Sequence, residues 1–166
     1  MNTKKLTFLS LSVALSMILS FIESQIPPFV AVPGIKLGLS NVLTVFLLYT
    51  YGWREAGAVL LIRVLLSSLL FGSPVSLVYS LSGAVISFTV MVLLKRFPIF
   101  NEISVSTVGG VFHNAAQIAV ACIVMENAAI SSYLPVLVLS GTLAGVGVGL
   151  ISGILVKKLK GRLISF

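Results

Sequence analysis

The sequence is a succession of long apolar runs separated by short polar turns. Hydrophobic residues make up 58% of the 166 residues, and charged residues make up only 9%, whereas a soluble domain carries about a quarter charged residues. A membrane-spanning helix needs about 20 predominantly apolar residues. The runs therefore predict an all-α integral membrane protein, with residues 1–166 forming one domain. Its six-transmembrane-helix bundle is expected to have spans at residues 6–22, 37–51, 55–71, 76–94, 104–125 and 133–156.

Basic residues gather at the ends of these runs. With six spans, nine of the eleven lysines and arginines fall on one side of the membrane: Lys4, Lys5, Arg54, Lys95, Arg96, Lys157, Lys158, Lys160 and Arg162. Because cytoplasmic loops carry the excess of basic residues, this side is predicted to be cytoplasmic, together with both termini. The net charge of +7 then reflects topology, and nucleic acid is not an expected partner. We expect a multi-pass protein surrounded by membrane lipid, as in a bacterial plasma membrane.

The predicted outer side carries a proline-rich segment at residues 27–36, which should form a stiff, ordered loop. Glu23 precedes this segment and Lys36 ends it, shortly before Asn41 in the second span. A lysine beside the amides of a helix N-terminus is well placed to bind an anion. The alternative is a surface pair between Lys36 and Glu23, which would contribute little stability.

Arg63 lies in the middle of the third apolar run. A lone charge there costs at least about 2.5 kcal/mol, so the guanidinium needs a partner. Carbonyl oxygens, a bound anion or a glutamate could serve, and the chain has no aspartate. Glu23 and Glu126 are the candidates from the outer side and Glu55 is the candidate from the inner side. Arg63 is therefore either a ligand-binding residue or a purely structural one.

The fifth run contains His113, Asn114 and Gln117 in an otherwise apolar setting. At helical spacing His113 and Gln117 are one turn apart, and Asn114 lies on nearly the same face. Hydrocarbon offers these groups no hydrogen-bond partner, so each must find one inside the protein. They predict either a ligand site or a set of hydrogen bonds between helices.

Two stripes of small residues are candidates for docking a partner. The sixth run has Gly141, Gly145 and Gly149 at four-residue spacing, which lets another helix approach closely. The first run has Ser10 and Ala14, beside a second stripe of serines. Both stripes are also compatible with packing inside the bundle.

No catalytic set is evident in the sequence. It contains no G-x-x-x-x-G-K-[ST] phosphate loop, no aspartate to hold Mg²⁺ on a diphosphate, and a single histidine. Its single cysteine, Cys122, is interpreted as a small apolar residue. We therefore expect no catalytic residue, no metal and no cofactor.

Several strings together resemble the Gx transporter family, also labelled heptaprenyl diphosphate synthase component I. They are residues 33–41 (PGIKLGLSN), Arg63, Ser82-Gly83 and His113-Asn114-x-x-Gln117, and the resemblance extends over nearly the whole chain. The family is similar to the S components of energy-coupling-factor transporters, which are small six-helix membrane proteins. The resemblance implies a vitamin-like ligand, a shared transmembrane coupling subunit that docks on the first helix, and separate ATPases. The docking stripe reads Ser10-x-x-x-Ala14 here, in place of the usual pair of alanines.

The leading hypothesis is a non-enzymatic, substrate-binding subunit of an importer for a small vitamin-, flavin- or quinone-precursor-like molecule. Its expected ligand contacts are the polar residues discussed above: Glu23, Lys36, Asn41, Arg63, His113, Asn114 and Gln117. The alternative is a membrane scaffold subunit in isoprenoid or quinone metabolism, or in flavin-based extracellular electron transfer.

Overall fold

The computed structural model describes residues 3–26 and 38–163, and all regular secondary structure in these ranges is helical. The helices are α1 (Thr3–Gln25), α2 (Asn41–Thr50), α3 (Trp53–Phe71), α4 (Pro74–Leu94), α5 (Glu102–Val124), the 3₁₀ helix η1 (Ala128–Tyr133) and α6 (Leu134–Leu163). This confirms the all-α class. The predicted proline-rich loop and Lys36 lie outside the described residues.

Within the described ranges, four helical segments are long and apolar enough to cross a membrane: α1, α4, α5 and Ala128–Leu159, which joins η1 to α6. The chain is thus compatible with a membrane protein. Helix α2 has only 10 residues, and α3 carries Arg54, Glu55 and Arg63. The count of six spans, and the side of the membrane on which the termini lie, remain predictions.

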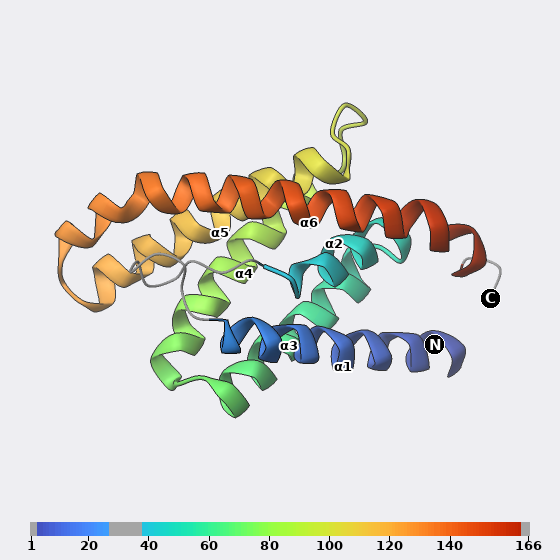
Figure 1. Ribbon diagram of the computed structural model, residues 1–166, viewed down its shortest axis with the longest axis horizontal. Coiled ribbons are helices and arrows are strands. Elements are labelled where there is room, and N and C mark those ends of the chain that lie inside the picture. Colours follow the sequence, from blue (N-terminus) through green and yellow to red (C-terminus); the bar gives the residue numbers. More distant parts are fainter. Residues whose placement is uncertain (1–2, 27–37, 164–166) are drawn as a thin grey trace.

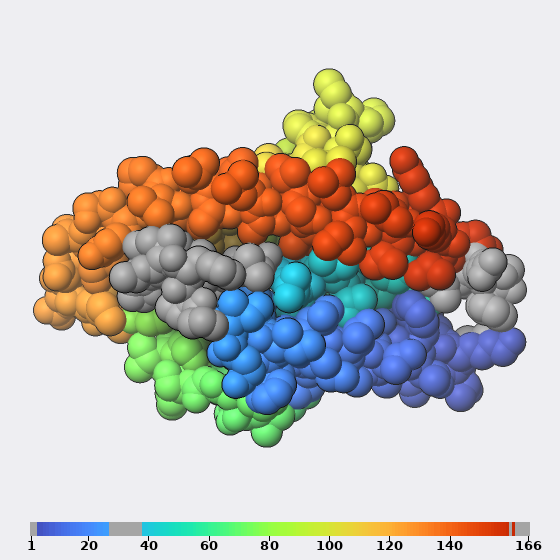
Figure 2. Space-filling model, viewed as in Figure 1, coloured from blue at the N-terminus to red at the C-terminus, as the bar shows by residue number. Residues whose placement is uncertain are grey.

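The helices pack in a fixed order of neighbours (Figure 1). α6 lies against α5, α5 against α4, α4 against α3, and α3 against α1, while α2 packs on both α3 and α6. The beginning of α1 and the end of α6 lie at the same end of the molecule. Figure 2 shows atoms of α2 (cyan) between α1 (blue) and α6 (orange to red).

Helix α2 is shorter than the predicted span 37–51 because its start is set by a turn. Gly38 has φ +72°, a left-handed conformation that favours glycine, and its carbonyl accepts the Asn41 N–H at 2.8 Å. Gly52, with φ +111°, then separates α2 from α3. A second tight junction joins α3 to α4, where Ser73 forms a reciprocal capping box with Ser76.

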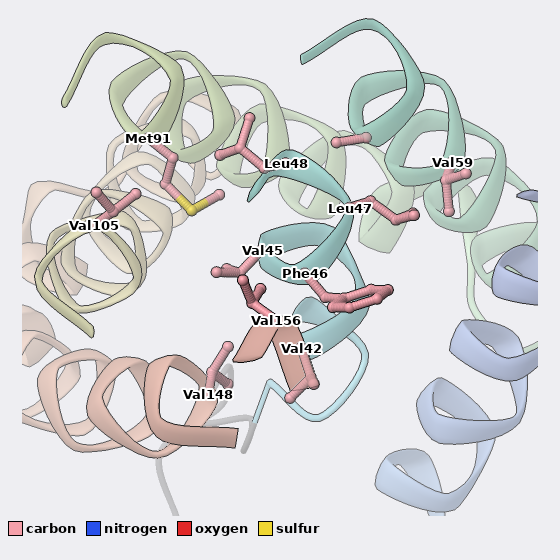
Figure 3. Packing of buried hydrophobic residues seen from close by; sticks show 11 residues of the cluster. Val42, Val45, Phe46, Leu47, Leu48, Val59, Met91, Val105, Val148 and Val156 are labelled. Atoms are coloured by element: carbon pink, nitrogen blue, oxygen red, sulfur yellow. The ribbon is translucent and has the colours of Figure 1, made fainter. Parts of the chain in front are cut away.

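The hydrophobic core is built around α2. Its residues from Val42 to Leu48 are all buried. Five of them form one cluster with Val59 of α3, Met91 of α4 and Val148 of α6 (Figure 3): Val42, Val45, Phe46, Leu47 and Leu48. A helix that is apolar on every face belongs in an interior. α2 is therefore an inner element enclosed by the other helices, which explains how so short a helix is accommodated.

The ends of α2 are held by cations from other parts of the chain. Arg63 of α3 donates to the side chains of Ser40 and Asn41 at the first turn. Lys95, at the end of α4, donates from Nζ to the carbonyl of Leu48 near the last turn. These bonds complement the apolar packing along the helix.

The glycine stripe of α6 packs against α5 of the same chain. A Cβ at Gly145 would lie 2.6 Å from Thr107 Cα, and a Cβ at Gly149 would lie 2.6 Å from Ile103 Cα. A Cβ at Gly141 would lie 2.7 Å from the Gly110 carbonyl oxygen. The prediction that these three glycines dock a partner is wrong, because the backbone of α5 already occupies the surface that they provide.

The two stripes of α1 differ in burial. Ser12 and Ser16 are buried, and their hydroxyls donate to the backbone carbonyls of Phe8 and Val13. Ser10 and Ala14 are exposed on the outer surface of the bundle. Docking through Ser10 and Ala14 therefore stays a prediction.

Candidate functional site

A cavity of about 200 Å³ lies inside the bundle, lined by residues from all six α-helices. It brings together six residues that the sequence singles out as candidate ligand contacts: Glu23, Asn41, Arg63, His113, Asn114 and Gln117. Much of its lining comes from the end of the bundle where α1 and α3 finish and where α2 and α4 begin. In the six-span topology this is the predicted outer end.

Arg63 is the buried charge of the site. Its side chain is 7% exposed, its Nη1 donates to Ser40 Oγ, and its Nη2 donates to Asn41 Oδ1 at 3.0 Å. Its Nε has no hydrogen-bond partner among the described residues. The sequence predicts carbonyl oxygens, a glutamate or an anion as partners, whereas the protein partners found are two neutral side chains.

None of the four glutamates forms a direct ion pair with Arg63 among the described residues. Glu55 instead pairs with Lys5, joining α3 to α1, so its candidacy as the inner partner of Arg63 is wrong. Glu23 does line the cavity, and its Oε1 accepts the backbone N–H of Gly38. This bond ties the last turns of α1 to the turn that precedes α2.

His113 and Gln117 lie where α5 faces Gly83 of α4. Both side chains are half-buried and line the cavity. A Cβ at Gly83 would lie 2.9 Å from Gln117 Cγ and 3.0 Å from His113 Cε1. The absence of a side chain at Gly83 therefore leaves the space that these two polar side chains occupy.

Asn114 connects α5 to α6. Its Nδ2 donates to the Leu137 carbonyl at 2.6 Å and lies 3.4 Å from Ser140 Oγ, and the side chain is 9% exposed. The amide N–H groups are thus used between helices, as the packing alternative predicts for this residue. Asn114 still forms part of the cavity wall.

Serines dominate the polar lining, which the sequence reasoning missed. Nine of them contribute: Ser20, Ser24, Ser40, Ser67, Ser68, Ser76, Ser80, Ser87 and Ser106. Some hydroxyls are committed to the backbone, since Ser67 donates to the Arg63 carbonyl and Ser87 to the Gly109 carbonyl, each at 2.7 Å. The available signal was the spacing of Ser76, Ser80 and Ser87, which places them on one face of α4.

The chain matches the sequence profile described as heptaprenyl diphosphate synthase component I over residues 12–156. The chain belongs to this family. The matched range contains every residue that lines the cavity. Comparisons with curated proteins and with solved structures find no match.

The family name describes one component of a synthase. Within residues 3–26 and 38–163, no group of three or more histidine, cysteine, aspartate or glutamate side chains is arranged to hold a metal ion. The site consists instead of one buried guanidinium, a carboxylate at Glu23, an imidazole, amides and hydroxyls. Such groups bind a ligand by hydrogen bonds and charge.

Proposed function

We propose that this protein is a membrane-embedded, substrate-binding subunit of an energy-coupling-factor-type importer for a small molecule. The observation that carries the proposal is a cavity inside an apolar helical bundle, with polar side chains from several helices converging on it. Polar and ionisable groups inside membrane proteins are costly and tend to serve a function. The chain itself is not an enzyme in this proposal, and it needs no cofactor.

The direction of entry follows from the predicted topology. The cavity includes Glu23 at the end of α1, Asn41 at the start of α2 and Ser76 at the start of α4. The distribution of basic residues predicts that this end faces outward. Ligand would therefore enter from outside, with Lys36 as a further contact from the adjoining segment.

Energy has to come from other subunits, because the chain has no phosphate-binding loop. We expect a shared transmembrane coupling subunit and ATPases. The exposed positions Ser10 and Ala14 on α1 are the proposed docking points, now that the glycines of α6 are accounted for by α5.

The test of this function is direct binding followed by uptake. Purified protein should bind at least one member of a panel of vitamins, flavins and quinone precursors. His113→Ala should abolish uptake of that molecule while leaving the helical content and assembly of the protein unchanged. A failure of the whole panel, with and without partner subunits, would remove the basis for the proposal.

The family name favours a second candidate, a non-catalytic scaffold subunit that holds another synthase component at the membrane. This function predicts that the two components co-purify and that His113→Ala leaves synthase activity in membranes unchanged. Under the importer function, deletion of this chain should stop uptake and spare prenyl diphosphate synthesis.

A further inference from the structure

We propose that the cavity takes a small acid with a single negative charge and about one ring, with its oxyanion bound by Arg63. A polyprenyl diphosphate is excluded as its occupant. This inference rests on the proposed function, because it names the class of ligand for the same cavity.

The first step is the charge of Arg63. A buried guanidinium is stable when its charge is compensated and its donors are satisfied. Here Ser40 and Asn41 are neutral, Nε lacks a partner among the described residues, and no carboxylate there is in ion-pair contact. Because Arg63 lines the cavity, an oxyanion entering it supplies the missing acceptor for Nε and forms a charge-assisted hydrogen bond with the guanidinium.

The second step is the position of Glu23. Its carboxylate lines the same cavity and is held there by the Gly38 N–H. The negative charge of Glu23 repels an anionic ligand, and it repels a multiply charged one more strongly than a monoanion. The chain has no aspartate, and residues 3–26 and 38–163 contain no group of three or more acidic, histidine or cysteine side chains that could place Mg²⁺ on a diphosphate. Among the described residues, one guanidinium and one carboxylate line the cavity, and this pair suits a monoanion better than a diphosphate.

The third step is size. The cavity has a volume of about 200 Å³, and a cavity of about 150 Å³ holds a benzene molecule. One ring with a carboxylate and small substituents fits this space, whereas a chain of seven prenyl units is several times larger. Nine serines also line the cavity, so much of the described wall offers hydroxyl groups, which suit a polar molecule better than a prenyl chain.

The experiment uses the full chain, purified in detergent, and simple probes. Isothermal titration with benzoate, a one-ring monoanion, should show saturable binding, and benzamide, its neutral counterpart, should bind about tenfold more weakly or not at all. Farnesyl diphosphate should not compete with benzoate. Equal binding of benzamide and benzoate, or displacement of benzoate by farnesyl diphosphate, would overturn the inference.

Substitutions then assign the anion site. Arg63→Gln should weaken benzoate binding about tenfold or more, and Arg63→Lys, which keeps the charge, should retain part of it. Arg54→Gln is the matched control, because Arg54 lies on the same helix, is exposed and stacks on Trp53 at 5.3 Å. Arg63→Gln with unchanged affinity contradicts the inference. If Arg63→Gln does not fold, the comparison of benzoate with benzamide on the natural chain still tests whether the cavity prefers an anion.

The experiments can support or contradict the anion site independently of the importer function. A neutral vitamin that binds and is imported, in the absence of benzoate binding, would sustain the importer and overturn the anion site. Benzoate binding without uptake of any small acid would sustain the anion site and count against the importer.

Discussion

At the scale of single residues, two polar side chains that line the cavity also join helices to one another. Asn114 joins α5 to α6, and Arg63 joins α3 to the first turn of α2. The sequence locates these residues because polar side chains are rare in apolar runs. It cannot tell which neighbouring helix each one contacts, since that depends on the rotation of every helix about its axis.

Asn114→Ala should destabilise the bundle, while the other polar side chains of the cavity stay in place. The substitution removes the 2.6 Å bond to the Leu137 carbonyl, and hydrogen bonds between membrane helices contribute about 0.6 kcal/mol on average and up to about 1.7. The measurement is the free energy of unfolding in mixed micelles. Thr142→Val is the control, because the Thr142 hydroxyl donates within α6, to the Val138 carbonyl at 2.8 Å. An equal loss in both variants would contradict the assignment.

Gly83→Ala should impair ligand binding more than stability. The added methyl group would lie too close to Gln117 Cγ and His113 Cε1. Both side chains can rotate away, and their rotation would change the polar groups that face the cavity. Binding of the imported molecule and the midpoint of thermal unfolding are the two measurements. A large drop in the midpoint with normal affinity would show that Gly83 serves packing alone.

At the scale of the helices, the α5–α6 pair is held by close backbone approach. The four-residue glycine spacing is visible in the sequence, but the same pattern suits a partner subunit and a neighbouring helix equally well. Only the fold identifies α5 as the neighbour. The burial of α2 was likewise beyond sequence reasoning, because a short apolar helix looks the same whether lipid or protein surrounds it.

Gly145→Ala should destabilise the protein by about 1–3 kcal/mol. The added methyl group would meet Thr107 Cα at 2.6 Å and the Ser106 carbonyl oxygen at 2.8 Å, and backbone atoms cannot move aside as a side chain does. Gly147→Ala is the matched control on the same helix, because nothing lies within 4 Å of its added Cβ. The stability of the two variants in detergent is compared. Similar values would mean that α6 does not pack on α5 in this way.

At the scale of the whole molecule, the number of times the chain crosses the bilayer decides which side the cavity faces. Four segments qualify by length and composition, and α2 and α3 either add two crossings or turn back within the membrane. The two arrangements differ in the side on which the α2–α3 junction lies. The cavity belongs to the outer end in the six-span arrangement.

Cysteine labelling distinguishes these arrangements, because Cys122 is the sole native thiol. In a Cys122→Ser background, Arg54→Cys should react with a membrane-impermeant maleimide only after the cells are opened. Ser131→Cys, exposed beyond α5, should react in intact cells, and Ile99→Cys, 84% exposed at the opposite end, should not. Labelling of Arg54→Cys in intact cells, with Ile99→Cys still unlabelled, would rule out six crossings.

The enclosure of α2 has a consequence for how the protein matures. A helix of 10 residues is too short to persist by itself, and the groups that anchor its ends belong to α3 and to the end of α4. We therefore expect α2 to become stable only when these neighbouring helices have packed around it. Since Asn41 and Val45 form part of the cavity wall, we expect the binding site to be complete only when α2 has packed, and a bound molecule would then stabilise the folded protein.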